Sequence, residues 1–383
     1  MRDMKRIAVL GSGLVGGVMV RDLSSDPSLE IRVFDFSEQN LARVKDLPRV
    51  SVSKADLSSR EAVTAAVADA DVVVGAVPGR MGLAMLETVI AAGKSISDIS
   101  FSPENPLSLH DSARARGVTV IVDCGVSPGL SNVAVGRAAS KLDRIDEAVI
   151  YVGGLPLERH WPFEYRSVFS PTDVIEEYTR PARMVVDCRV VVRPALSETE
   201  LLDFEGVGTL EAFNTDGLRT LIDTVPARNM REKTLRYPGH VDRMRMLRET
   251  GFFDDTPEKV GGVQVVPREL TEKLLFRAWK RPENERELTV LRVVVTGSAG
   301  GKTRRYSYDL FDVTDSVTGE TSMARTTGFP CAIMARLLAS GEYREPGVIP
   351  PEKFAPDDRV YDRLVRELEQ RGVRFRETVE SLD

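Results

Sequence analysis

A glycine-rich turn between two apolar segments is the feature that most constrains the fold of this chain. The stretch VLGSGLVGGVMV carries Gly11, Gly13 and Gly16 in a G-x-G-x-x-G spacing. The run before the turn is continuously apolar, as in a buried strand, and apolar residues recur at helical spacing after it. A second apolar run at 31–34 ends at Asp35, 19 residues after Gly16. Together these features predict a βαβ unit with an acid at the end of its second strand.

Each part of this βαβ unit has a mechanical role in binding a dinucleotide. The glycines permit a tight turn, close approach of the backbone to a pyrophosphate and helix–strand packing, and the helix N-terminus favours phosphate. The alternative, a turn that binds nothing, is disfavoured because strand, helix and acid all occur in the required order. Asp35 would accept hydrogen bonds from ribose hydroxyls and repel a 2′-phosphate, which favours NAD over NADP. The predicted NAD-binding residues are Gly11, Gly13, Leu14, Val15, Gly16, Asp35, Asp56, Ala76, Val77 and Pro78.

Strands and helices are predicted to alternate through the first third of the chain. Further strands are expected at 49–54, 71–77, 95–99 and 118–122, with helical segments between them. Such alternation is typical of a doubly wound parallel sheet, in which ligands bind at the carboxyl ends of the strands. We therefore predict an α/β fold in which residues 1–128 form a Rossmann domain that is completed by residues 325–383.

The character of the sequence changes after residue 129. Runs with period two occur at 185–192 and 288–295, whereas helical patterns are restricted mainly to 222–233 and 241–249. We predict a second, α+β domain over residues 129–324, built on a mixed or antiparallel sheet.

Composition excludes several classes of partner. The net charge is -6, so there is no basic surplus for nucleic acid or anionic lipid, and no run is long and apolar enough to span a bilayer. Three scattered cysteines argue against a disulfide framework and suit a reducing, cytoplasmic location. No cluster of His, Cys and acidic residues has metal-ligand spacing, so no catalytic metal is expected.

Hydride transfer to a nicotinamide needs a nearby group that accepts or relays a proton. Asp98, Glu104 and Asp123 fall at the ends of predicted strands, where a ligand would bind, although a helix cap or a surface acid is the structural alternative for each. His240 follows Arg236 in the segment RYPGH, a Gly-Pro loop of the kind that often carries site residues.

These motifs resemble those of the lysine 6-dehydrogenases of the saccharopine dehydrogenase-like superfamily. The segments that carry the resemblance span nearly the whole chain: GSGLVGG, SDISFSPENPL, DCGVSPGLSN, YVGGLP, EEYTRPAR, LEAFNTDGLRT, TLRYPGHVDRMRML, ARTTGF and GVIPPE. The resemblance implies NAD-dependent oxidative deamination of L-lysine at the ε-carbon, giving 2-aminoadipate 6-semialdehyde, which cyclises to a piperideine carboxylate. It also implies a homodimer in which the second domain supplies substrate contacts and the subunit interface.

The chemistry of lysine assigns roles to the candidate residues. The ε-ammonium must lose a proton before hydride can leave its carbon, and the candidate acceptors are Asp98, Asp123 and His240. Arg236 or Arg219 would bind the substrate carboxylate, since a forked donor suits it, and Glu104 would bind the α-ammonium. Two alternatives remain open: a dehydrogenase of saccharopine or carboxynorspermidine, and an NAD-binding sensor without turnover.

Overall fold

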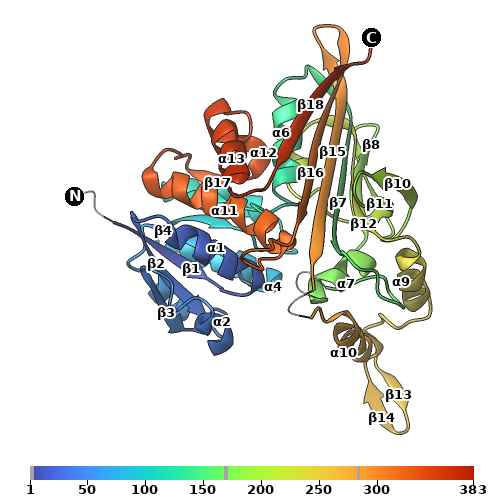
Figure 1. Cartoon of the computed structure of the whole chain (residues 1–383), viewed down its shortest axis with the longest axis horizontal. Coiled ribbons are helices and arrows are strands. Elements are labelled where there is room, and N and C mark those ends of the chain that lie inside the picture. Colours follow the sequence, from blue (N-terminus) through green and yellow to red (C-terminus); the bar gives the residue numbers. More distant parts are fainter. Residues whose placement is uncertain (1–3, 168–170, 283–284) are drawn as a thin grey trace. The chain divides into compact units, whose positions relative to one another are not determined.

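The computed structural model describes residues 4–167, 171–282 and 285–383 (Figure 1). Contacts divide the chain into two compact units. Unit 1 comprises residues 1–140, 223–225 and 324–375, and unit 2 comprises 141–222, 226–323 and 376–383.

Unit 1 is built on a seven-stranded sheet in which every pair of neighbours is parallel. The strand order is β17-β6-β5-β4-β1-β2-β3. The strands are β1 (Lys5–Leu10), β2 (Leu29–Asp35), β3 (Val50–Lys54), β4 (Val72–Gly75), β5 (Ser95–Asp98), β6 (Thr119–Ile121) and β17 (Gly347–Ile349). The order reverses between β1 and β4, where a doubly wound sheet opens a crevice for a ligand.

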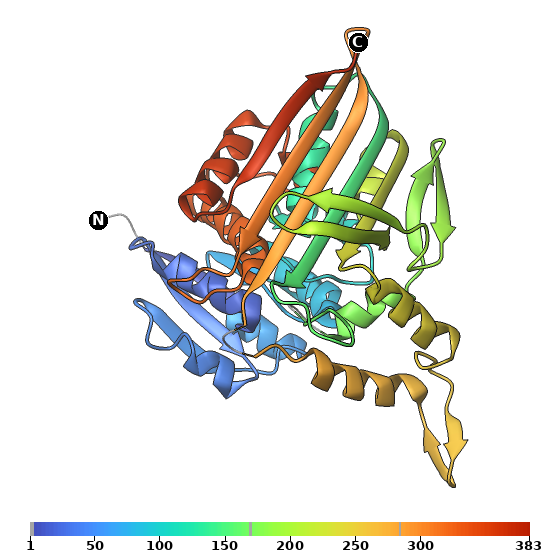
Figure 2. The same ribbon diagram turned by 45° about the vertical axis from the view of Figure 1, so that its right-hand side comes forward.

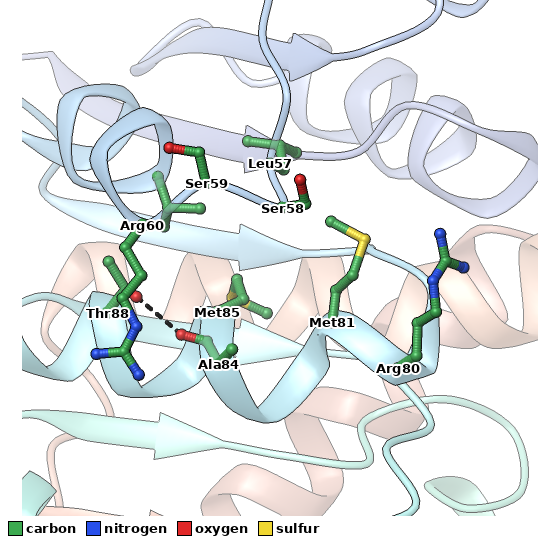
Figure 3. Close-up of a pocket in the computed structure, with 10 residues that line it drawn as sticks. Leu57, Ser58, Ser59, Arg60, Arg80, Met81, Ala84, Met85 and Thr88 are labelled. Carbon is green, nitrogen blue, oxygen red and sulfur yellow. Dashed lines mark hydrogen bonds between the residues drawn. The ribbon is translucent and has the colours of Figure 1, made fainter.

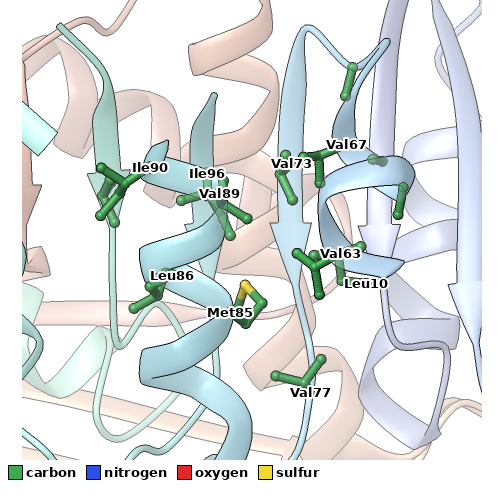
Figure 4. Close-up of a cluster of buried hydrophobic side chains, with 14 of the residues drawn as sticks. Leu10, Val63, Val67, Val73, Val77, Met85, Leu86, Val89, Ile90 and Ile96 are labelled. Carbon is green, nitrogen blue, oxygen red and sulfur yellow. The ribbon is translucent and has the colours of Figure 1, made fainter. Parts of the chain in front are cut away.

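Helices connect these strands and cover the sheet. They are α1 (Leu14–Ser24), α2 (Glu38–Ala42), α3 (Arg60–Val67), α4 (Gly79–Ala91), the 3-10 helix η1 (Pro106–Leu109), α5 (His110–Ala115), α6 (Leu130–Ala139), α11 (Ser322–Ser340), α12 (Pro351–Phe354) and α13 (Asp358–Gln370). Figure 4 shows how α3 and α4 pack on β1, β4 and β5 through side chains such as Val67, Val73 and Val89, all fully buried. Burial of this apolar face holds the carboxyl ends of these strands in place.

Unit 2 is built on a nine-stranded mixed sheet. Its main path is β10-β11-β12-β7-β15-β16-β18, and β8 pairs with β12 and β9. The strands are β7 (Arg144–Pro156), β8 (Ala182–Val186), β9 (Arg189–Arg193), β10 (Glu200–Phe204), β11 (Gly208–Asn214), β12 (Ala227–Arg236), β15 (Glu287–Ala299), β16 (Lys302–Val313) and β18 (Phe375–Ser381). Among the strand pairs of this sheet whose residue register is described, β7 and β12 are parallel and the others are antiparallel (Figure 2).

Helices α7 (Pro171–Thr179), α9 (His240–Glu249) and α10 (Pro267–Trp279) belong to unit 2, and α8 (Leu221–Thr224) lies where the chain passes between the units. A separate hairpin of β13 (Glu258–Val260) and β14 (Val263–Val265) precedes α10. Aromatic side chains dominate the core under these helices, with Tyr178, Phe213 and Trp279 fully buried. The predicted fold class, a Rossmann-like parallel sheet plus an α+β domain with a mixed sheet, is confirmed.

The structure corrects the helix predicted at 222–233. Helix α8 ends at Thr224, and Ala227–Arg236 form β12, between β11 and β7. The period-two run at 185–192 is interrupted by a tight turn between β8 and β9, in which Asp187 and Cys188 have positive φ angles of 45° and 62°.

The unit boundaries differ from the predicted domain limits mainly at three places, one of which is residues 223–225, which belong to unit 1 and not to the second domain. Helix α6 belongs to unit 1, so the first segment of that unit ends at residue 140 rather than 128. Residues 376–383 belong to unit 2, because β18 joins its sheet beside β16. Within the described ranges, no helix has the length and apolar character needed to cross a membrane.

Candidate functional site

The glycine-rich loop between β1 and α1 is tightly packed at two glycines and open at the third. Gly11 has a φ of +99°, and its N–H donates to Phe34 O at 2.8 Å. A Cβ atom on Gly11 would overlap the carbonyl oxygen of Ala76, and one on Gly16 would overlap the carbonyl oxygen of Gly11. A Cβ atom on Gly13 would meet nothing within 4 Å. The open space at Gly13, at the N-terminus of α1, fits a pyrophosphate approaching the backbone.

Asp35, the last residue of β2, lies against this loop. Its carboxylate accepts hydrogen bonds from Ser12 N at 2.6 Å, Ser12 Oγ at 3.1 Å and Ser37 N at 2.7 Å. The side-chain amide of Asn40 approaches both carboxylate oxygens, at 3.4 and 3.3 Å. The predicted acid is therefore where the fold requires it, but it is held by the chain itself.

A pocket of about 240 Å³ that is open to solvent lies between α3 and α4 (Figure 3). Leu57 and Met81 line it, with Arg60 and Arg80 at opposite ends. Asp56 directly precedes the lining residues Leu57, Ser58 and Ser59 of the turn after β3. Ala76, Val77 and Pro78 precede α4, which supplies the other lining residues. Asp56 accepts from Ser58 N and Oγ at 3.1 and 2.7 Å, so it shapes the turn into α3. A pocket with apolar walls at this position suits a planar aromatic ring.

Asp98 and Asp123 come together at the carboxyl ends of β5 and β6. Both are almost fully buried, with 1% and 2% of their surface exposed. Burial, together with the negative charge of Asp123, raises the pKa of Asp98 to about 8, although Ser100 Oγ donates to Asp98 Oδ1 at 2.8 Å. A buried carboxyl group with a pKa near neutrality is the type of group that exchanges protons in catalysis.

His240 does not have the geometry of the proton acceptor predicted from its loop. It is fully buried in unit 2, with Nδ1 2.7 Å from Phe163 O and Nε2 2.9 Å from the hydroxyl of Tyr178. Because a carbonyl only accepts, Nδ1 carries the proton and Nε2 accepts from Tyr178. Burial and the charge of Arg236 lower the pKa of His240 to about 3. The ring is a neutral core histidine with both nitrogens bonded, which contradicts the expected catalytic role.

The guanidinium of Arg236 is likewise engaged in hydrogen bonds with other residues of unit 2. It is 1% exposed, and its guanidinium donates to Glu177 Oε2 at 2.5 Å, to Leu235 O at 3.0 Å and to Tyr178 Oη at 3.4 Å. A substrate carboxylate would have to displace Glu177 to reach it. Arg219 is 6% exposed and has a positive φ of 53°. Glu104 is exposed in the loop after β5 of unit 1.

Arg236 belongs to a row of buried polar residues on β12 whose other members were not predicted. Glu232, Thr234 and Arg236 alternate along the strand, and Glu232 accepts from Thr215 Oγ1 at 2.5 Å. Burial is the main cause that raises the pKa of Glu232 to about 8. The period of two was the available signal, but the helix expected at 222–233 concealed it.

Known proteins place the chain in a family. The family model of the saccharopine dehydrogenase NADP binding domain matches residues 7–121, and that of the saccharopine dehydrogenase C-terminal domain matches residues 125–373. The mitochondrial alpha-aminoadipic semialdehyde synthase of Mus musculus is 22% identical over 98% of this chain and 48% of its own length. The chain thus spans about half of that relative. The carboxynorspermidine synthase of Vibrio cholerae is 25% identical over 75% of this chain and 73% of its own length.

A solved structure shows the same fold. The apo saccharopine dehydrogenase (L-Glu forming) from Saccharomyces cerevisiae superposes with a TM-score of 0.81 over 98% of this chain and 100% of its own, at 18% identity. Both family models are domains of saccharopine dehydrogenase, the first of them an NADP binding domain, and together they cover nearly all of the sequence. The chain belongs to the saccharopine dehydrogenase family, whose members are oxidoreductases acting on CH–NH2 groups.

Proposed function

We propose that the protein catalyses the NAD-dependent oxidative deamination of L-lysine at its ε-carbon. The observation that carries the proposal is the buried pair Asp98 and Asp123 in the unit that also carries the glycine-rich loop. A substrate amine is protonated in water, and a positive charge beside the departing hydride opposes its loss. The site therefore needs a group that removes this proton first.

Asp98 is matched to that task by its pKa. A lysine ammonium has a pKa of about 10.4 and an ordinary aspartate one near 3.9, so an ordinary carboxylate accepts its proton very unfavourably. Burial brings the pKa of Asp98 to about 8, which removes most of this mismatch. The charge of Asp123 is one of the causes that raise the pKa of Asp98, so it favours the protonated form of Asp98 once the transfer has occurred.

The dinucleotide would be held by Gly11, Gly13 and the N-terminus of α1, with Leu14, Val15 and Gly16 in the first turn. Asp35 would meet the adenosine ribose, and the pocket lined by Leu57 and Met81 would take the adenine. When bound, the cofactor would supply the acceptor for the hydride that leaves the ε-carbon. Water then adds to the resulting imine and releases ammonium and the aldehyde.

Asp35 supports NAD as the cofactor, because a carboxylate at the end of β2 repels a 2′-phosphate. The matching family model is named for NADP, so the two cofactors must be compared directly. A carboxylated polyamine is the second candidate substrate, since one relative is named a carboxynorspermidine synthase.

The test is absorbance of reduced nicotinamide with purified protein and either NAD or NADP. L-lysine, saccharopine, ornithine, carboxynorspermidine and no amine are assayed separately, with wild type and Asp98→Asn. We expect reduction of NAD with lysine, lost in the variant. Reduction only with saccharopine or carboxynorspermidine would replace the substrate, and binding of NADH without reduction by any amine would favour a sensor.

We also propose that the protein forms a homodimer and is located in the cytoplasm. Large apolar side chains stand exposed in the segment around α10 and its hairpin, namely Phe252, Val260, Val263, Leu270 and Leu274. An isolated two-stranded hairpin is marginally stable in water, so a partner surface is expected to cover it. The three cysteines are unpaired, as suits a reducing compartment. Light scattering of the wild type and of Leu274→Glu tests the dimer.

A further inference from the structure

The carboxylate of Asp35 is bonded to the glycine-rich loop itself. Ser12 lies between Gly11 and Gly13, is 1% exposed, and directs both its backbone N–H and its hydroxyl to Asp35 Oδ2. The other oxygen, Oδ1, accepts from Ser37 N. Asp35 thus joins the turn after β1 to the turn after β2 through hydrogen bonds of 2.6 to 3.1 Å.

These bonds use most of the accepting capacity of the side chain. A carboxylate offers about four acceptor positions. Ser12 and Ser37 occupy three of them, and the amide of Asn40 shares the rest at 3.3 and 3.4 Å, longer than an ordinary N–H···O bond. A ribose hydroxyl can therefore displace Asn40 readily, whereas displacing Ser12 would free the loop.

We propose that Asp35 is a positioning residue for the pyrophosphate as well as a partner of the ribose. Its bonds to Ser12 fix the backbone of Gly11 to Gly13, whose shape decides whether N–H groups face the phosphates. This role rests on the proposed binding of a dinucleotide at this loop. It predicts a different result for removal of Asp35 than a role at the ribose alone. An acid that acted only on the ribose would, when removed, admit a 2′-phosphate. Removal of Asp35 instead weakens the binding of both cofactors.

The experiment is a fluorescence titration of NADH and of NADPH without any amine, so it does not depend on which substrate is used. Asp35→Ala is compared with wild type and with Asn40→Ala, which loses a contact to the same carboxylate but leaves Ser12 bonded. A buried charge-assisted hydrogen bond contributes enough for a loss of roughly tenfold or more, so we expect Asp35→Ala to bind both cofactors at least tenfold more weakly. Asn40→Ala should change either affinity by less than about threefold.

Hydrogen exchange of the ligand-free proteins provides a second readout. Amides of residues 12–17 should exchange faster in Asp35→Ala than in wild type or Asn40→Ala, while amides of β7 in unit 2 stay unchanged and show that the variant is folded. Equal or tighter binding of NADPH by Asp35→Ala, with unaltered loop exchange, would overturn the proposal. Absence of turnover with lysine would overturn only the proposed deamination.

Discussion

The carboxyl group of Asp98 lies directly over Gly75 of the neighbouring strand β4. A Cβ atom on Gly75 would overlap Asp98 Oδ1 and approach Met85 Cε to 2.8 Å. Asp98 has little freedom to move aside, because it is buried and bonded to Ser100. The absence of a side chain at position 75 thus makes room for a carboxyl group at the end of β5.

We expect Gly75→Ala to destabilise the fold and to impair turnover together. Overpacking of a buried site costs about 1–3 kcal/mol, and here the added methyl group meets a fixed carboxyl group. Urea denaturation measures the free energy of unfolding, and the nicotinamide assay measures turnover. Unchanged stability in this variant would show that Asp98 can shift without strain.

Gly13→Ala is the matched control for Gly75→Ala, because it should weaken cofactor binding without lowering the free energy of unfolding. Its Cβ atom meets no protein atom within 4 Å, and its φ of -64° lies outside the left-handed region that favours glycine. The ligand-free protein should therefore keep its free energy of unfolding to within about 0.5 kcal/mol. Binding of NADH should weaken roughly tenfold or more, because the methyl group occupies the path of the pyrophosphate. A loss of stability equal to that of Gly75→Ala would contradict this assignment.

The raised pKa of Asp98 predicts how stability changes with pH. Its pKa is about 8 when folded, against 3.8 for a fully solvated aspartate, so between about pH 4 and 8 folded Asp98 holds a proton that the unfolded chain has released. The free energy of unfolding therefore falls as pH rises through this window. In Asp98→Asn this contribution is absent, so the stability of the variant relative to wild type should increase up to about pH 8 and then level off. Denaturation midpoints at a series of pH values measure the difference, and they separate it from similar effects of Glu232 and Glu287.

The same group predicts the pH dependence of turnover. If ionised Asp98 accepts the substrate proton, kcat/KM should rise about tenfold per pH unit below pH 8 and flatten above it. Asp98→Asn should be slow at every pH and lack this limb. A limb near pH 8 that persists in the variant would assign proton transfer to another group.

The variant His240→Phe tests whether His240 has a structural or a catalytic role. The change removes the acceptor for the Tyr178 O–H and the donor to the Phe163 carbonyl, which should lower the free energy of unfolding by about 2 kcal/mol or more. The limb of the rate profile near pH 8 should remain, because folded His240 has a pKa of about 3. Unfolded histidine takes up a proton below about pH 6.5, so wild type should lose stability more steeply than the variant as pH falls from 6.5 toward 3.

The placement of Asp98 and Asp123 at one edge of the unit 1 sheet could be predicted from the sequence, because it follows from one rule of topology, whereas their role stays a prediction. Asp98 and Asp123 end strands that are neighbours in a parallel sheet, so their proximity follows from the order of β5 and β6. The bonds of Asp35 were less predictable. An acid at the end of β2 is expected in such a fold, but its partner Ser12 lies at a position of the glycine motif that any residue can occupy.

In unit 2 the local sequence was misleading for a physical reason. The segment RYPGH has the glycine and proline of an exposed loop, yet the atoms that satisfy His240 belong to Phe163 and Tyr178, far away along the chain. No local pattern encodes such partners. A usable signal did exist for β12: Pro226 lies inside the helix expected at 222–233, where a proline removes a hydrogen bond and clashes with the preceding turn.

Strand β17 has a consequence for how the chain is made. It completes the sheet of unit 1 beside β6, but Gly347 follows Ile121 by 226 positions. While the ribosome is still producing the intervening segment, β6 presents unpaired backbone groups at an open sheet edge, which is a template for pairing with other chains. A nascent or truncated polypeptide that ends before residue 347 is therefore expected to depend on a chaperone, because that edge stays open until β17 has been made.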